Sequence, residues 1–287
     1  MVSPQNRPLD FLLEQEPFRR ANTDVNLVDV STIFLLGQRC PVGCAMCDLH
    51  VGLLEQPTPA GAIPNQIDFA QQRLPTTPWI KLYNGGNFFD PSGIPPTDLP
   101  AIADRCRSYD RVVVENHPRF GSHRHREFRD SIPGRLEVAV GLESVQPRFL
   151  DRINKRMTRD DFDRYARRLE QWDIDLRVFL IVGAPGLSIA ESIRWARLSV
   201  RHAMSAGARH ISLIPARSGS GWNGQAGALP QITADVLGEL FSASLEDLSG
   251  PACLSVDLWG FQQPGIEAEA RSELGRLESA IRNQVSL

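Results

Sequence analysis

Residues 31–48 read STIFLLGQRCPVGCAMCD, an apolar run that leads directly into three cysteines with the spacing CxxxCxxC. The run 31–37 is short and contains Thr, Ile and Phe, which is typical of a β-strand. Because almost all of it is apolar, we expect a parallel strand that is covered on both faces. Cys40, Cys44 and Cys47 then lie in the loop that leaves the carboxyl end of this strand.

The same alternation continues along the rest of the chain. Further short apolar runs predict strands at 79–84, 111–116, 136–142, 176–182, 210–215 and 254–259. Amphipathic patterns predict helices at 97–109, 158–172, 188–206, 233–248 and 267–285, and a leading helix at 10–20. Two of these helices begin with capping-box patterns, Thr158 with Asp161 and Ser188 with Glu191. Regular β-then-α units predict right-handed crossovers and a parallel sheet.

The predicted fold class is therefore α/β, a partial (β/α)6-type TIM barrel of parallel strands with outer helices. A doubly wound sheet is the alternative, because the order of strands in a sheet cannot be read from one sequence. We expect an N-terminal extension with the leading helix over 1–29, the barrel over 30–250, and a C-terminal strand and helix over 251–287. In both folds the chemistry takes place at the carboxyl ends of the strands.

Composition excludes several other classes of protein. The chain has 287 residues, of which 42% are hydrophobic and 23% charged, as in ordinary globular domains. Its net charge of −3 argues against broad nonspecific binding to nucleic acid. We find no signal peptide and no stretch long enough to span a bilayer, and therefore expect a soluble, cytoplasmic protein without membrane contact.

The cysteine loop has the chemistry of a metal site. Three thiolates on one tight loop can bind three irons of a 4Fe-4S cluster and leave one iron open, whereas most such clusters have four cysteine ligands. The rival is zinc, because His50 extends the pattern to a Cys3His set. A third interpretation is three buried structural cysteines. Cys106 and Cys253 stand alone; Cys106 lies in a helical pattern and is expected in the core.

CxxxCxxC directly after the first barrel strand resembles the radical S-adenosylmethionine (SAM) enzymes. The resemblance implies that SAM chelates the open iron through its amino and carboxylate groups. It also implies that an electron from the cluster cleaves SAM to methionine and a 5′-deoxyadenosyl radical, which abstracts hydrogen from a substrate. Met46 replaces the aromatic residue that this family often has before the third cysteine.

Two strand ends extend the resemblance. Gly85 and Gly86 are similar to the family's glycine pair, whose backbone receives the SAM ammonium group, although Asn87 stands where the family often has Glu. The segment VENHP ending at residue 118 resembles the E-x-x-P end of the branch with the elongator catalytic subunit and oxygen-independent coproporphyrinogen oxidase. In that pattern Glu115 accepts hydrogen bonds from the SAM ammonium or ribose.

Two later segments complete the match to this elongator- and methylthiotransferase-like core. In the stretch from Gly141 onward, Glu143 and Ser144 occupy the ribose-contact motif, and Lys155 falls where a cation pairs with the SAM carboxylate. Ile181 lies on the strand expected beside adenine. Four motifs in order after predicted strands favour the SAM interpretation over zinc.

The substrate is less well defined. Residues 83–95 look most like the archaeosine-biosynthesis radical SAM branch, which implies a tRNA base or a nucleoside as substrate. An external electron donor similar to flavodoxin or ferredoxin is implied as a partner. The arginine-rich segment 117–135 suggests contact with RNA phosphate, although a solvated helix face is the simpler interpretation. A non-catalytic iron–sulfur or zinc-binding protein stays open as the alternative.

Overall fold

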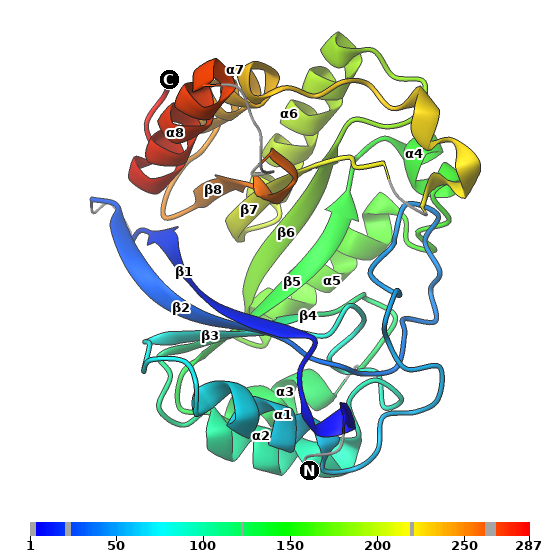
Figure 1. The fold of residues 1–287 in the computed structure, drawn as a ribbon, viewed down its shortest axis with the longest axis vertical. Helices are drawn as coiled ribbons and strands as arrows, with labels where there is room; N and C mark the ends of the chain where they lie inside the picture. The colour runs from blue at the N-terminus through cyan, green and yellow to red at the C-terminus, as the bar shows by residue number, and fades with distance from the viewer. Residues whose placement is uncertain (1–3, 21–23, 122, 219–220, 262–267) are drawn as a thin grey trace.

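The computed structural model describes residues 4–20, 24–121, 123–218, 221–261 and 268–287, and one eight-stranded sheet organises them (Figure 1). The strands are β1 Asp10–Phe18, β2 Asn26–Phe34, β3 Trp79–Tyr83, β4 Arg111–Glu115, β5 Arg135–Glu143, β6 Asp175–Val182, β7 Ala208–Pro215 and β8 Cys253–Val256. Each predicted parallel strand is present, with ends that differ from the expected bounds by a few residues.

Helices cover the outer face of this sheet (Figure 1). They are α1 Ala62–Gln71, α2 Leu99–Arg105, α3 Arg124–Ser131, α4 Pro147–Arg152, α5 Arg159–Gln171, α6 Ile189–Ser205, α7 Ala234–Leu245 and α8 Ala268–Asn283. Short 3-10 turns occur at Pro4–Asn6, Pro96–Asp98, Trp222–Gly224, Ala226–Ala228 and Trp259–Phe261. Both predicted capping boxes are formed, at the starts of α5 and α6. Residue 267, the first of the last predicted helix, lies outside the described residues.

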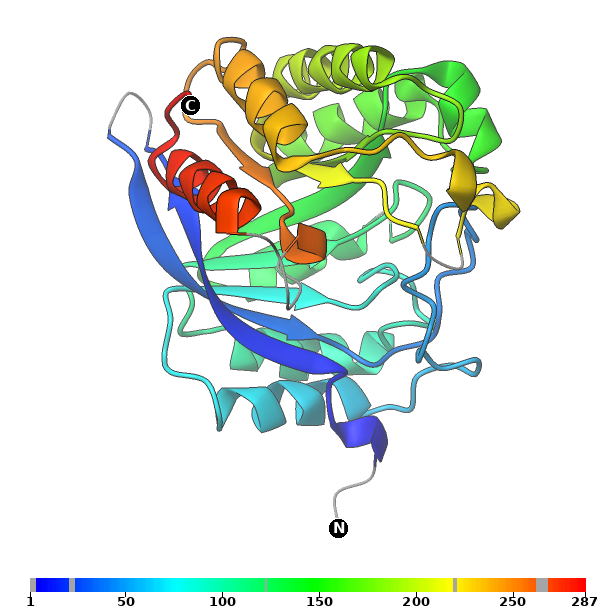
Figure 2. The same cartoon turned by 45° about the horizontal axis from the view of Figure 1, so that its top comes forward.

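The strand order is sequential, from β1 to β8, and every pair from β2 onward is parallel. The sheet curls into a barrel that begins with β1 and ends with β8, and no ladder joins these two described strands. Helix α8 contacts both of them and lies across the seam (Figure 2). The partial barrel of parallel strands is therefore confirmed, and the doubly wound alternative is excluded.

The predicted leading helix at 10–20 is wrong, because residues 10–18 form β1, which pairs with β2 in antiparallel register. Residues two apart, such as Glu14 and Glu16, would lie on nearly opposite sides of a helix. In the strand they point to the same side, because side chains two apart in sequence share one face of a sheet. Both carboxylates contact Lys81 on β3.

The strands are less uniformly apolar than expected for coverage on both faces. In β5, Leu136, Val138 and Val140 belong to the main hydrophobic core, whereas Glu137 between them is also fully buried. The alternation has the period of two that a strand imposes, so one face packs on the helices and the other faces the barrel interior. Polar residues on the interior face are the first departure from the sequence-based expectation.

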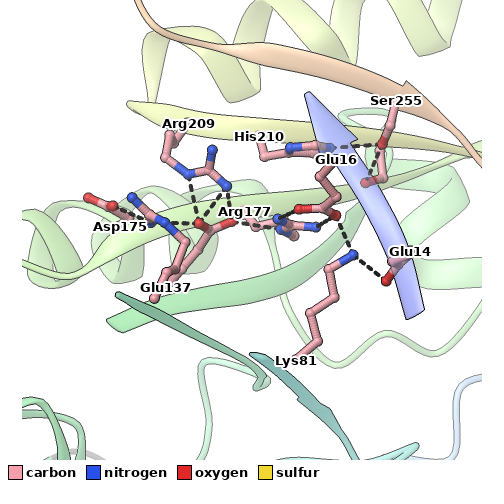
Figure 3. A network of polar contacts seen from close by, with 11 residues as sticks. Glu14, Glu16, Lys81, Glu137, Asp175, Arg177, Arg209, His210 and Ser255 are labelled. Carbon is pink, nitrogen blue, oxygen red and sulfur yellow. Dashed lines mark hydrogen bonds and ion pairs between the residues drawn. The ribbon is translucent and has the colours of Figure 1, made fainter. Parts of the chain in front are cut away.

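These interior polar groups form a connected ionic network near the amino ends of the parallel strands (Figure 3). Glu137 accepts hydrogen bonds from Arg111, Arg177 and Arg209 at 2.6–2.8 Å. Arg177 also donates to both oxygens of Glu16 at 2.6 and 2.7 Å. We refer to this set as the interior charge layer: Glu14, Glu16, Lys81, Arg111, Glu137, Asp175, Arg177 and Arg209.

Helices α1 and α4 were not predicted, whereas α3 lies within the segment 117–135, for which a solvated helix face was the simpler interpretation. Among the described residues, no helix is long and apolar enough to cross a membrane.

The lone cysteines are both fully buried: Cys106 ends α2, as expected for a core residue, and Cys253 begins β8.

Candidate functional site

The cysteine loop leaves the carboxyl end of β2 and is held in place by backbone hydrogen bonds from distant segments. Ala45 N donates to Ile153 O at 2.8 Å, and Trp222 N donates to Ala45 O. Gly43 adopts a φ of 67°, a left-handed conformation that favours glycine and turns the loop back. The loop is therefore fixed against the segments that follow α4 and β7, on the right of Figure 1.

The three thiols of this loop differ from the two core cysteines. Cys40, Cys44 and Cys47 are half-buried, and Asn87 Nδ2 donates to Cys40 Sγ at 3.2 Å. Burial raises the pKa of Cys44, and it raises the pKa of Cys47 to about 11. A metal must therefore displace protons when it binds these thiols.

The same loop does not present a set for a single ion. His50 is exposed, and no three Cys, His, Asp or Glu side chains among the described residues are gathered to hold one metal ion. The Cys3His zinc set is thus not assembled here. A cubane differs in this respect, because each of its cysteines binds a different iron. Three accessible thiols on one anchored loop fit that donor set.

The turn after β3 packs against the cysteine loop. Gly85 adopts a φ of 58°, and a Cβ there would come within 3.2 Å of Leu49 O, so this position favours glycine. Glu115, the last residue of β4, accepts hydrogen bonds from Asn84 N at 2.7 Å and from Gly86 N at 3.3 Å. Burial raises the pKa of Glu115 despite these bonds. Glu115 therefore shapes the glycine turn, a role that its sequence position alone did not reveal.

Two asparagines of this turn are polar groups that sequence reasoning left unassigned. Asn84 is fully buried, and neither atom of its side-chain amide has a hydrogen-bond partner among the described residues. Asn87 Oδ1 accepts from His117 N at 2.7 Å, while its amide nitrogen contacts Cys40. The available signal was position, since Asn84 ends the predicted strand 79–84 and Asn87 comes three residues later.

Glu143 and Lys155 form a buried ion pair of 2.6 Å. Glu143 ends β5 with a φ of 64°, and Lys155 follows α4. Burial opposes the charge of Lys155, but Glu143 and the neighbouring Cys44 outweigh it, so the pKa of Lys155 is raised. The lysine therefore stays cationic and lies within electrostatic reach of the cysteine loop.

Gly141 leaves room for this pair. A Cβ at Gly141 would lie 2.1 Å from Glu143 Oε1 and 2.7 Å from Lys155 Nζ. A larger residue would therefore push the flexible ends of both side chains out of their present positions. The β5–β6 register also shifts between Gly141 and Glu143, which turns the end of the strand.

The remaining predicted positions line a small pocket beside the ion pair. Ser144 and Ile181 both border it, together with Gly183 at the end of β6. Ser144 Oγ accepts from Gln146 N at 3.2 Å and so starts the turn into α4. All ten predicted site residues thus lie at the carboxyl ends of β2 to β6, some in direct contact and others in adjoining turns.

Comparison with known proteins identifies this architecture. No family model matches the chain, and no curated protein matches it in sequence. Among solved structures, the chain is similar to Streptococcus suis SuiB bound to S-adenosylmethionine, with a TM-score of 0.58 and 11% identity over 87% of this chain and 55% of that one. Methylornithine synthase PylB matches with a TM-score of 0.55 and 11% identity, over 89% of this chain and 81% of PylB.

A third similar structure, the archaeal Methanocaldococcus infernus Elp3 with its N-terminus deleted, has a TM-score of 0.54 and 13% identity over 78% of this chain and 60% of that one. The chain thus spans little more than half of SuiB and Elp3. At sequence identities of 11–13%, the similarity to these structures establishes the fold alone. The chain has the barrel fold of radical SAM enzymes, as the resemblance in sequence implied.

Proposed function

We propose that this protein is a radical SAM enzyme. The proposal rests on one observation. Three features lie together at the carboxyl-end rim of a barrel that has the fold of radical SAM enzymes. The three features are the anchored cysteine loop, the glycine turn held by Glu115, and the Glu143–Lys155 pair. A non-catalytic iron–sulfur protein would need the cysteines but not the other two.

In this proposal Cys40, Cys44 and Cys47 hold a 4Fe-4S cluster and SAM binds beside it. When bound, the cluster supplies the electron that cleaves SAM to methionine and a 5′-deoxyadenosyl radical, which abstracts hydrogen from substrate. Asn87 donates to the Cys40 sulfur, and such a bond stabilises a thiolate.

The chain's other rim residues would bind SAM. Gly85 and Gly86 leave the backbone accessible to the SAM ammonium group, while Glu115 fixes their turn. Lys155 would pair with the SAM carboxylate, held in position by Glu143. Glu143 and Ser144 would meet the ribose, and Ile181 the adenine.

For the substrate we propose a planar base, carried by a nucleoside or a tRNA. Three half-buried aromatic side chains, Phe34, Tyr83 and Phe179, face the interior between the rim and the interior charge layer. Their ring centroids lie 6.3 Å apart for Phe34–Tyr83 and 6.1 Å apart for Tyr83–Phe179. Aromatic walls of this kind stack on bases. Burial raises the pKa of Tyr83 to about 12, so its hydroxyl stays neutral.

An external electron donor of the flavodoxin or ferredoxin type and a cytoplasmic location belong to the same proposal. The enzyme needs one electron for each cleavage, and an exposed low-potential cluster requires a reducing compartment.

The decisive experiment combines metal analysis with SAM cleavage. Protein prepared without oxygen should contain about four irons per chain. After reduction it should release 5′-deoxyadenosine from SAM. Replacing Cys40, Cys44 or Cys47 by Ala should abolish both the cluster and cleavage.

Matched controls come from the two core cysteines. Cys106→Ala and Cys253→Ala should keep full iron content, because these thiols are fully buried, at the end of α2 and at the amino end of β8. Stoichiometric zinc without iron would overturn the proposal. An intact cluster that never cleaves SAM would instead identify an iron–sulfur binder.

A further inference from the structure

A pocket of about 290 Å³ opens on the outer side of the same rim, between the loop after β4 and the start of α5. Four arginines line it: Arg119, Arg156, Arg164 and Arg168. Its one acidic side chain is Asp161. The pocket therefore concentrates positive charge in a chain whose net charge is −3.

This charge is largely uncompensated. Asp161 already accepts hydrogen bonds from the Thr158 backbone and hydroxyl, and it pairs with Arg164. Arg119, Arg156 and Arg168 make no ion pair with any residue that the structure describes, and all three are exposed. Some arginines outside the pocket are paired, as Arg105 is with Asp68 and Arg135 is with Asp173.

The pocket adjoins the proposed SAM site through two direct links. His117, which lines the pocket, follows Glu115 by two residues, and its Nε2 bonds to Lys155 O at 3.0 Å. Arg156 is the next residue after Lys155. Burial, with the nearby Lys155, lowers the pKa of His117 to about 4, so the imidazole is neutral at pH 7.

From these contacts we infer that the pocket binds a phosphate group of the substrate. Guanidinium groups present planar pairs of donors that match phosphate oxygens, and several of them around one cavity select a multiply charged oxyanion. A phosphate seated here would lie at the rim, so the rest of its molecule can extend toward the barrel mouth. That the pocket binds phosphate does not depend on the proposed function. The identity of the molecule that carries the phosphate does depend on it.

The phosphate has two sources, the backbone of an RNA or the ester of a small nucleotide. The test uses a triple variant, R119Q/R156Q/R168Q, and a matched control, R167Q/R194Q/R276Q. The control arginines are likewise exposed and without an ion pair among the described residues, and the change in net charge is the same. The melting temperature of the control should equal that of the wild type. That of the pocket variant should fall only slightly, because Arg168 stacks on Trp172 at 5.8 Å but none of the three arginines forms an ion pair with the described residues.

Binding is measured for the anaerobically prepared holoenzyme with fluorescently labelled unfractionated tRNA at several KCl concentrations, and with guanosine 5′-monophosphate. For an RNA phosphate, the pocket variant should bind tRNA about tenfold more weakly and reduce the salt slope by about 1, since the pocket holds one phosphate and each phosphate contact adds ~0.9. For a small phosphate ester, it should lose binding of the nucleotide while tRNA binds weakly throughout. The control should match the wild type in both arms.

Equal binding of both probes by the wild type and the pocket variant would overturn the inference. So would an equal loss in the control, which would reveal a general effect of net charge. SAM cleavage by the wild type is assayed separately. If the pocket binds phosphate but the wild type never cleaves SAM, the proposed function fails and the phosphate site stands.

Discussion

Glu137 on β5 and Glu115 on β4 are glutamates of neighbouring strands with opposite surroundings. Glu137 accepts hydrogen bonds from three arginines, which outweigh burial and hold its pKa below the ordinary value. Glu115 accepts only backbone N–H groups, and burial raises its pKa. The amino end of the barrel neutralises its own charges, whereas the carboxyl end leaves polar groups available for a ligand.

The largest effect should come from breaking the interior charge layer. Glu137→Gln removes the anion shared by Arg111, Arg177 and Arg209, and the loss of one partner from a buried ionic network costs about 3–5 kcal/mol. Denaturant unfolding measures this free energy. The matched change Glu115→Gln keeps the acceptor oxygen and should cost less than about 1 kcal/mol. An equal loss of unfolding free energy in the two variants would contradict the contrast between the amino and carboxyl ends of the barrel.

Acid should reveal the same contrast with opposite signs. The folded-state pKa of Glu137 lies below its unfolded value, so its stabilisation is complete above the unfolded pKa and is lost as pH falls through the folded pKa. Glu115 has a raised pKa, so the folded state binds its proton first and gains stability as pH falls. Unfolding measured below neutral pH should therefore lose stability less steeply in Glu137→Gln and more steeply in Glu115→Gln. Identical slopes in the two variants would contradict both assignments.

The chain has two lysines, Lys81 and Lys155, and replacing each in turn tests stability and ligand binding separately. Lys155→Ala should weaken SAM binding about tenfold to a hundredfold, since a hydrogen bond to a charged group contributes ~1.5–3 kcal/mol. Lys155→Arg should recover part of that affinity. Lys81→Ala, in the interior charge layer, should destabilise the fold but leave the SAM affinity of the folded protein unchanged. Calorimetric titration of the iron-loaded protein tests this, and an unchanged affinity in Lys155→Ala would assign the SAM carboxylate to another cation.

A smaller effect is expected at Gly141. An added methyl group must displace the flexible ends of Glu143 and Lys155, so Gly141→Ala should weaken SAM binding less than Lys155→Ala does. Gly227→Ala is the control, because no atom lies within 4 Å of a Cβ built there. A loss of affinity in both variants would point to backbone stiffening and away from the ion pair.

The parallel strands of this barrel could be predicted because their helix-facing residues are apolar. This holds even where the residues that face the barrel interior are charged. Strand β1 could not, because Glu14 and Glu16 obtain their partners from β3 and β6, far along the chain. A single sequence does not show which charges will meet.

The candidate site divides in the same way. The cysteines, the glycine pair and Lys155 occur in short local patterns, so sequence identified them as candidates. Asn84, Gly141 and the arginine pocket depend on segments that meet only in three dimensions. The segment 117–135 is only partly the solvated, arginine-rich face that its sequence suggested. His117 and His125 are buried, and Arg129 pairs with Asp130. Residue 122 lies outside the described residues.

The ion pair between Glu16 and Arg177 joins residues 161 positions apart. Glu16 has two cationic partners, and during synthesis Lys81 on β3 follows it much sooner than Arg177 on β6 does. Contacts of such long sequence separation slow folding, because a large loop must close before they form. Strand β1 can therefore pair with β2 early, but the barrel completes its ionic centre only after β6 has been synthesised.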